Sequence, residues 1–188
     1  MTTPWKPTKE QVLAAETKTV ADVIAPDLSV LFCGINPGLY TAAVGRHFAR
    51  PGNRFWRALY DGGFTSRVLS PFDQLELLNS GYGITNVVAR TTARADQLTK
   101  DEIVKGGKLL QKKVRRYRPG ILAVLGLGAY RTAFNCPEAT TGRQQAKVGE
   151  TVLWVLPNPS RLNANYQQRD LALLFQELKA EVDGMDKR

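Results

Sequence analysis

A chain of 188 residues is long enough to bury one hydrophobic core, and its 43% hydrophobic and 23% charged residues are typical of globular proteins. These values exclude a disordered or fibrous chain, and no apolar run approaches the roughly 18 residues that a membrane-spanning helix requires. The formal net charge of +9 favours a polyanionic partner, although many basic proteins bind no nucleic acid. Residues 1–10 lack the apolar core of a signal peptide, so we expect a cytoplasmic protein with no membrane association.

The predicted elements alternate between helix and strand along the chain. Helices are expected within residues 8–22, just after Asn53, from Thr99 to about Tyr117, and along an apolar stripe from Leu171 to Val182. Strands are expected at four short apolar runs, residues 29–35, 82–86, 120–125 and 151–156. Three of these runs are almost continuously apolar, which indicates strands that are covered on both faces.

This alternation predicts a three-layer α/β/α sandwich around a mainly parallel sheet of four to five strands. The sequence contains no internal repeat, low-complexity stretch or linker. We therefore expect a single domain over residues 1–188, with residues 1–21 and 184–188 as peripheral tails.

Two of the predicted strands run directly into an Asn-Pro step, at Asn36 and at Asn158. Ligands of open α/β sheets bind beyond the carboxyl ends of the strands. An Asn-Pro step sets a rigid, extended backbone and presents a short amide side chain. One such step usually does no more than start a turn. Two steps at matching strand ends favour a binding site more than one step does, with two simple turns as the alternative.

Other catalytic motifs are absent or incomplete. The Gly126-Leu-Gly128 turn follows the third predicted strand, but Arg131 stands where a dinucleotide fingerprint needs a small residue. The two cysteines have no metal-ligand spacing, and a single histidine leaves too few ligands for zinc. We expect no metal and no organic cofactor.

The basic residues divide into two groups. One surrounds an aromatic ring in the loop that follows the first strand and comprises Arg46, His47, Arg50 and Arg54 around Phe48. Basic residues beside a stacking ring suit a nucleic acid whose base has left its stack, so we expect this group, including His47, to face DNA. The other group lies along the helix from Thr99, where we expect a solvated outer face.

Three segments resemble the mismatch-specific uracil-DNA glycosylase family, which is related to the thymine-DNA glycosylases. They are Gly34-Ile-Asn-Pro-Gly38, Phe48-Ala-Arg-Pro-Gly-Asn-Arg-Phe-Trp56 and Leu156-Pro-Asn-Pro-Ser160. The similarity extends from about Asp22 to about Leu178 and includes two active-site motifs in the right order. The resemblance implies an α/β/α sandwich of the uracil-DNA glycosylase type, in agreement with the pattern of helices and strands.

By position, the resemblance also implies roles for individual residues. Asn36 would hold the attacking water beneath the sugar. Backbone groups around Ile35 and Phe48 would hydrogen-bond the flipped base, and the Phe48 ring would stack on it. Asn158 would contact the extruded base or its sugar.

The segment after Ser160 would push into the duplex and touch the opposing guanine. Here Arg161-Leu162-Asn163 replaces the Gly-Leu-Ser type of run that many relatives have. Leu162 still suits a wedge, whereas the charge and bulk of Arg161 argue against strict recognition of guanine. We expect Arg46, Arg50 and this segment to bind DNA.

Uracil can spread the negative charge of a leaving base over two carbonyls, so cleavage needs hydrogen-bond donors rather than a strong acid. An amide such as Asn36 can orient water but cannot take its proton, which predicts a modest rate. We expect Asp96, in the loop 89–98, to assist catalysis as a carboxylate; the alternative is that it only solvates the loop.

Neighbouring residues add two expectations. Thr91, Thr92 and Arg94 are placed to reach phosphates. Tyr40 follows the Asn36 turn and would crowd the 5-position of the base, limiting thymine; alternatively it only packs.

We therefore predict a monomeric, monofunctional DNA glycosylase that flips uracil, and other modified pyrimidines, out of mismatched double-stranded DNA and hydrolyses the N-glycosidic bond, which starts base excision repair. Its partner would be duplex DNA with G·U or related mismatches, which would place it at the nucleoid. The alternative is a non-catalytic basic nucleic-acid-binding module, which explains the charge but gives the Asn-Pro steps no role. A nucleotide-dependent enzyme would need a phosphate loop that the sequence lacks.

Overall fold

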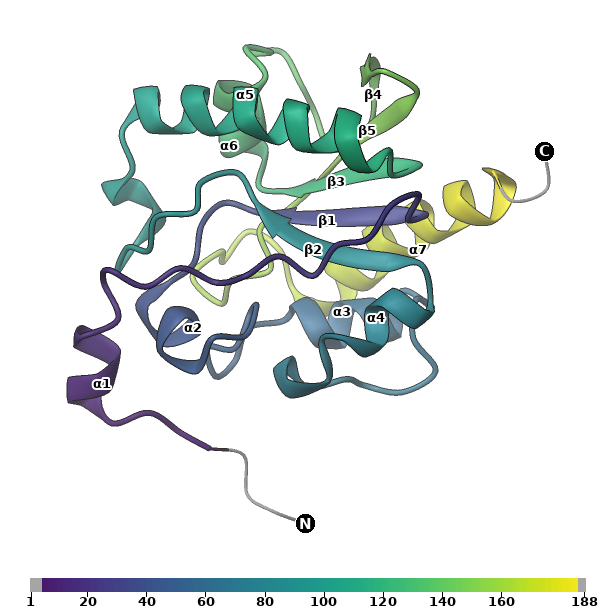
Figure 1. The fold of residues 1–188 in the computed structure, drawn as a ribbon. Helices are drawn as coiled ribbons and strands as arrows, with labels where there is room; N and C mark the ends of the chain where they lie inside the picture. The colour runs from purple at the N-terminus through teal and green to yellow at the C-terminus, as the bar shows by residue number, and fades with distance from the viewer. Residues whose placement is uncertain (1–4, 186–188) are drawn as a thin grey trace.

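The computed structural model describes residues 5–185, which are arranged around one five-stranded sheet (Figure 1). The strands are β1 (Val30–Gly34), β2 (Tyr82–Asn86), β3 (Ile121–Leu125), β4 (Gly142–Val148) and β5 (Thr151–Leu156), in the spatial order β2-β1-β3-β5-β4. β4 pairs antiparallel with β5, and the other neighbours are parallel. The predicted α/β sandwich with a mainly parallel sheet is confirmed.

Helices cover both faces of the sheet and enclose two hydrophobic cores (Figure 1). The helices are α1 (Lys9–Leu13), α2 (Leu39–Val44), α3 (Phe55–Asp61), α4 (Glu76–Asn79), α5 (Lys100–Tyr117), α6 (Leu127–Ala133) and α7 (Gln168–Met185), with short 3₁₀ turns η1 (Pro71–Asp73) and η2 (Ala95–Gln97). On one face, Leu110 and Tyr130 come from α5 and α6. On the other face, Phe55 of α3 and Phe175 of α7 pack on Phe32 of β1.

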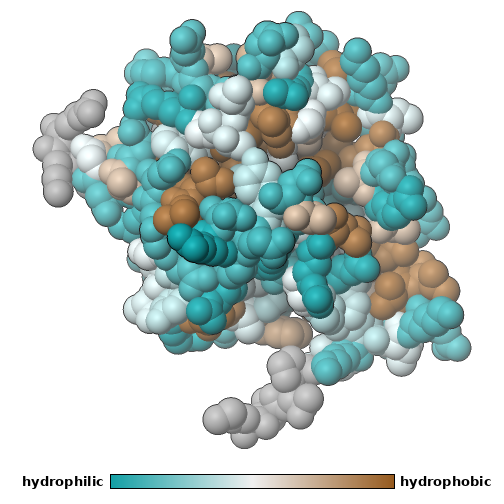
Figure 2. All heavy atoms as spheres, turned by 180° about the vertical axis from the view of Figure 1, so that it is seen from behind, coloured by the Kyte–Doolittle hydropathy of each residue, from teal (hydrophilic) through white to brown (hydrophobic). Residues whose placement is uncertain are grey.

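The start of α5 is capped by Thr99, as the sequence predicts. The Thr99 hydroxyl accepts a hydrogen bond from the Glu102 backbone N–H at 3.2 Å, and the Glu102 carboxylate accepts one from the Thr99 N–H at 2.8 Å. The predicted cap Asn53 lies one residue before Arg54, which holds the cap position of α3, and the Asn53 side chain accepts from the Phe55 N–H at 2.9 Å. None of the described helices is long and apolar enough to cross a bilayer. From behind, the surface is mostly hydrophilic with small, separate hydrophobic patches (Figure 2).

The N-terminal helix is shorter than the predicted 8–22. α1 ends at Leu13, and residues 18–23 run without helical structure beside β2, where Val23 forms an antiparallel bridge with Ile84. Three of the four residues 17–20 are β-branched threonine or valine, which disfavours continuation of the helix. The chain therefore leaves α1 early and becomes available to the sheet edge.

The fifth strand of the sheet is β4, which does not coincide with any of the four apolar runs predicted as strands. Its sequence, Gly-Arg-Gln-Gln-Ala-Lys-Val, is largely polar, and most of its side chains are exposed or half-buried. An edge strand open to solvent needs no apolar run, and charged side chains there discourage pairing with another chain.

The parallel register brings the predicted strand ends to one edge of the sheet. Gly34 at the end of β1 pairs with Asn86 at the end of β2, and β3 and β5 stay in register to their last residues. The loops after β1 and β5, which carry Asn36 and Asn158, therefore leave the sheet at the same edge.

The close packing of α5 gives a test of this fold. A Cβ added at Gly107 of α5 would lie 2.2 Å from the Ala133 carbonyl oxygen, whereas one added at Gly128 of α6 would meet nothing within 4 Å. Gly107→Ala should lower the free energy of unfolding by about 1–3 kcal/mol, because backbone must shift. Gly128→Ala should leave it unchanged or raise it by up to about 1 kcal/mol. Urea unfolding measures both, and a Gly107→Ala protein of wild-type stability would contradict this helix packing.

Candidate active site

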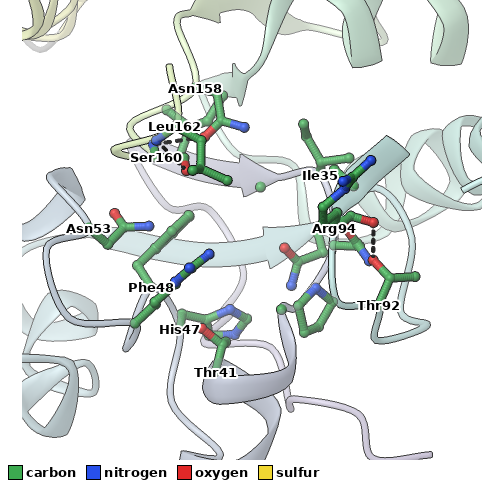
Figure 3. Close-up of a pocket in the computed structure, with 18 of the residues that line it drawn as sticks. Ile35, Thr41, His47, Phe48, Asn53, Thr92, Arg94, Asn158, Ser160 and Leu162 are labelled. Carbon is green, nitrogen blue, oxygen red and sulfur yellow. Dashed lines mark hydrogen bonds between the residues drawn. The ribbon is translucent and has the colours of Figure 1, made fainter. Parts of the chain in front are cut away.

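A cavity of about 410 Å³ opens at the carboxyl edge of the sheet (Figure 3). Its walls come from the loops after β1, β2 and β5 and from the segment between α2 and α3. The lining residues that the sequence had singled out are Ile35, Asn36, His47, Phe48, Arg50, Thr92, Arg94, Asp96, Asn158, Ser160, Leu162 and Asn163. Two Asn-Pro loops that lie far apart in the sequence therefore share one cavity.

The orientation of the Asn36 amide is fixed by its hydrogen bonds. Its Nδ2 donates to the Arg90 carbonyl at 2.9 Å and to the Thr92 hydroxyl at 2.7 Å. The Thr92 hydroxyl in turn donates to the Arg94 carbonyl at 2.8 Å. Since a carbonyl can only accept, the amide nitrogen must face this loop. No described residue donates to Asn36 Oδ1, so this oxygen remains to accept a hydrogen bond from a water or ligand.

Phe48 provides a stacking surface. Its ring lies 4.0 Å, centroid to centroid, from the ring of Phe55, with 28° between the planes, and it also lines the cavity. Phe48 adopts a positive φ of 52°, which is uncommon for a large side chain. A ring that is supported on one face and open to the cavity can stack a planar base on the other.

Asn158 presents its amide nitrogen to the cavity. Its Oδ1 accepts a hydrogen bond from the Ser160 N–H at 2.9 Å, and its carbonyl accepts one from Asn163 Nδ2 at 3.1 Å. No described residue accepts from Asn158 Nδ2. The cavity therefore combines an acceptor at Asn36 with a donor and a flat apolar surface. The donor is Asn158 and the apolar surface is Phe48, both labelled in Figure 3.

Sequence reasoning gave no role in the site to Asn86, and it assigned Thr92 the wrong one. Thr92 is 3% exposed and orients Asn36, so it does not reach a phosphate as expected. Asn86 ends β2 and lines the cavity. It lies so close to Gly34 that a Cβ added to Gly34 would be 2.6 Å from Asn86 Oδ1. The available signal was positional: Asn86 ends a strand at the same edge as Asn36.

Arg54 does not face DNA as predicted. Its guanidinium donates to the carbonyls of Pro159, Ser160 and Asn163 at 3.2, 2.7 and 3.0 Å, and also to the Tyr166 carbonyl. A guanidinium has five N–H donors and can therefore bind several backbone carbonyls at once. Arg54 therefore holds the loop that carries Asn158 and Leu162.

His47 and Thr91 were also expected to face DNA, and the structure corrects both. Each side chain is only 1% exposed. His47 Nε2 lies 2.9 Å from the Ala21 carbonyl, and burial lowers the pKa of His47, so the ring is neutral and donates through Nε2. The Thr91 hydroxyl donates to the Lys18 carbonyl at 2.5 Å. Arg94, the other expected phosphate contact, is paired with Asp96.

Asp96 is the acidic residue among the described residues that line the cavity. Its side chain is 62% exposed and both its oxygens accept from the Arg94 guanidinium, at 3.0 and 2.5 Å. These hydrogen bonds lower the pKa of Asp96, so it is an anion at neutral pH and a weak proton acceptor. Across the part of the chain that the structure describes, no three His, Cys, Asp or Glu side chains gather as a metal site would require.

The remaining predicted residues lie at or outside the rim. Tyr40, on α2, and Arg46 are not among the residues that line the cavity. A second hollow of about 230 Å³ adjoins it and is lined by Arg50, Arg161 and Leu162 among others. The Arg161 side chain lies across Gly52, where an added Cβ would be 2.3 Å from its Cδ.

Comparison with known proteins agrees with this fold. A family model described as Uracil DNA glycosylase superfamily matches residues 21–180. A solution NMR structure of a candidate uracil DNA glycosylase from Methanosarcina acetivorans superposes with a TM-score of 0.58 at 16% sequence identity, over 87% of this chain and 98% of that chain. At this identity the structural likeness supports the fold, and the family match extends over both Asn-Pro loops.

Proposed function

Because the chain belongs to the uracil DNA glycosylase superfamily, we propose that it excises uracil from double-stranded DNA by hydrolysing the bond between base and sugar. Its preferred substrates are G·U and related mismatches, and it leaves the DNA strand uncut. The observation that carries this proposal is the Asn36 amide, whose nitrogen is held by Arg90 and Thr92 and whose oxygen is unpaired at the cavity.

The flipped base stacks on the free face of Phe48 and accepts a hydrogen bond from Asn158 Nδ2, while backbone groups around Ile35 and Phe48 contact its edge. Extrusion costs a few kcal/mol and is least expensive for a mispaired base, which favours mismatches without any reading of the opposing guanine. Leu162, 72% exposed at the cavity mouth, fills the space that the base leaves.

Asn36 Oδ1 accepts a hydrogen bond from the attacking water and aims its lone pair at the sugar C1′. The water oxygen forms a bond with C1′ as the C1′–N1 bond breaks. The base departs with the bonding electron pair as an anion whose charge is spread over two carbonyls, and the proton lost by the water passes to solvent. No lysine is found among the described residues that line the cavity, which supports hydrolysis rather than a Schiff base. The acid-base demands on the protein are small.

Asn36→Ala should lower the single-turnover rate of uracil excision at least about 100-fold, because the water loses its positioning group. The substrate is a duplex with one G·U pair, incubated in chelator and then treated with alkali to cut abasic sites. Asn79→Ala, an exposed substitution on α4, serves as the control and should excise at the wild-type rate.

Two outcomes would contradict the proposed reaction. Wild-type protein that binds the duplex without producing alkali-labile sites would indicate a non-catalytic binding module. A covalent protein–DNA adduct trapped with borohydride would show lyase chemistry instead of simple hydrolysis.

Asp96 is proposed to assist only as a fixed negative charge near the cationic sugar. It is exposed and paired with Arg94, so Asp96→Asn should slow single-turnover excision by about two- to tenfold, far less than the loss of Asn36. Glu76→Gln, another exposed carboxylate paired with an arginine, is the matched control and should have no effect. A rate for Asp96→Asn equal to that of the control would remove Asp96 from catalysis.

Arg50 and Arg161 line the second hollow and are proposed to bind DNA phosphates. Each Arg→Gln change should reduce the slope of log affinity against log salt concentration by about 0.9, as expected for one lost phosphate contact. Fluorescence anisotropy with a duplex carrying an abasic-site analogue measures this slope. Lys112→Gln on the exposed face of α5 should leave it unchanged. An effect of Arg161→Gln that depends on the opposing base would indicate base recognition instead.

A further inference from the structure

The cavity walls are connected to a segment that lies outside the cavity, residues 18–23, which we call the N-terminal strap. Three buried side chains from the elements around the cavity form hydrogen bonds with the strap: His47 from the segment between α2 and α3, Thr85 from β2, and Thr91 from the loop after β2. Their exposed fractions are 1%, 0% and 1%, so none of them lies on the outer surface, although His47 also lines the cavity.

Each contact with the strap is a hydrogen bond. The Thr91 hydroxyl donates to the Lys18 carbonyl at 2.5 Å, and His47 Nε2 donates to the Ala21 carbonyl at 2.9 Å. The Thr85 hydroxyl donates to the Asp22 carboxylate at 2.8 Å.

The residue that follows each of these three side chains lines the cavity. His47 precedes Phe48, the stacking ring, and Thr85 precedes Asn86. Thr91 precedes Thr92, which accepts from the Asn36 amide. Thr85 and Asn86 lie in β2, where successive side chains point to opposite faces of the sheet. His47 lies in a turn and itself also lines the cavity. In each case a hydrogen bond to the strap fixes the chain immediately before a side chain that lines the cavity.

The strap is itself anchored to the sheet and to α5. Val23 exchanges two backbone hydrogen bonds with Ile84, at 2.9 and 2.7 Å. The Asp22 carboxylate also accepts from the Lys113 ammonium group of α5. At its other end, Val20 packs with Ala42 of α2. Because both ends are fixed, the strap can act as a rigid support for the loops that contact it.

We propose that the N-terminal strap is a positioning element, which sets the geometry of Asn36 and of the base-stacking ring through Thr91 and His47. This inference rests on the proposed function for its catalytic consequence. The strap includes Lys18, which lies before residues 21–180, the part of the chain that the family model matches. The family match therefore gives Lys18 no role.

Thr91→Val tests the strap, because it removes the hydroxyl and keeps the shape of the side chain. The matched control is Thr151→Val at the start of β5, where a hydroxyl that is 3% exposed donates to the Pro119 carbonyl at 2.6 Å, at the amino edge of the sheet. Both variants lose one buried hydrogen bond and should be destabilised to a similar extent.

At a temperature where all variants are folded, Thr91→Val should lower the single-turnover excision rate about tenfold with little change in DNA affinity. Thr151→Val should keep the wild-type rate, and Thr91→Ser should restore most of the activity. A wild-type rate in Thr91→Val, or an equal loss in Thr151→Val, would overturn the proposal.

A second measurement does not depend on activity. Amide hydrogen exchange in peptides covering residues 88–94 should be faster in Thr91→Val than in wild-type protein, and unchanged there in Thr151→Val. If the wild-type protein shows no excision but this exchange pattern appears, the proposed function is wrong and the positioning role of the strap is supported. If exchange is unchanged, the strap has no positioning role.

Discussion

The geometry of the site depends on the absence of a side chain at Gly34. At this last residue of β1, a Cβ would lie 2.6 Å from the Asn86 amide oxygen and 3.3 Å from the Phe48 ring. Neither neighbour can retreat easily, because Asn86 belongs to β2 and Phe48 is stacked on Phe55. A glycine here lets the two strand ends and the ring converge on one small volume, and the Asn36 loop starts from that point.

The polar groups around this point form an ordered series. The Asn36 amide nitrogen donates two hydrogen bonds to the loop after β2. That loop is in turn bound to the N-terminal strap by the hydrogen bond from Thr91 to Lys18. No described residue donates to the Asn36 oxygen that faces the cavity, whereas the amide nitrogen of Asn36 and the hydroxyls of Thr91 and Thr92 all donate to protein acceptors. Such an arrangement suits a reaction whose leaving group is already activated, because it demands orientation rather than a shifted pKa.

The sequence was sufficient to predict the parallel sheet and the two Asn-Pro loops, because buried strands are recognisable as apolar runs and parallel strands end at one edge. It did not locate β4, whose polar residues suit an exposed edge.

The role of a basic or hydroxyl side chain was harder to predict, because residue type does not reveal which way the chain faces. Arg54 and His47 occur beside Phe48 in a segment that reads as a DNA-binding loop, yet both are turned inward to backbone carbonyls. Their partners come from distant parts of the chain, and only the tertiary structure reveals them.

Arg54 has a consequence for the way in which DNA is engaged. Its guanidinium binds carbonyls between Pro159 and Tyr166, so the loop bearing Leu162 is already ordered before any duplex arrives. A preorganised wedge loses little conformational entropy on association. The deformation needed to admit Leu162 then falls mainly on the nucleic acid, so flexible or poorly stacked steps beside the lesion should be engaged more readily than stiff ones.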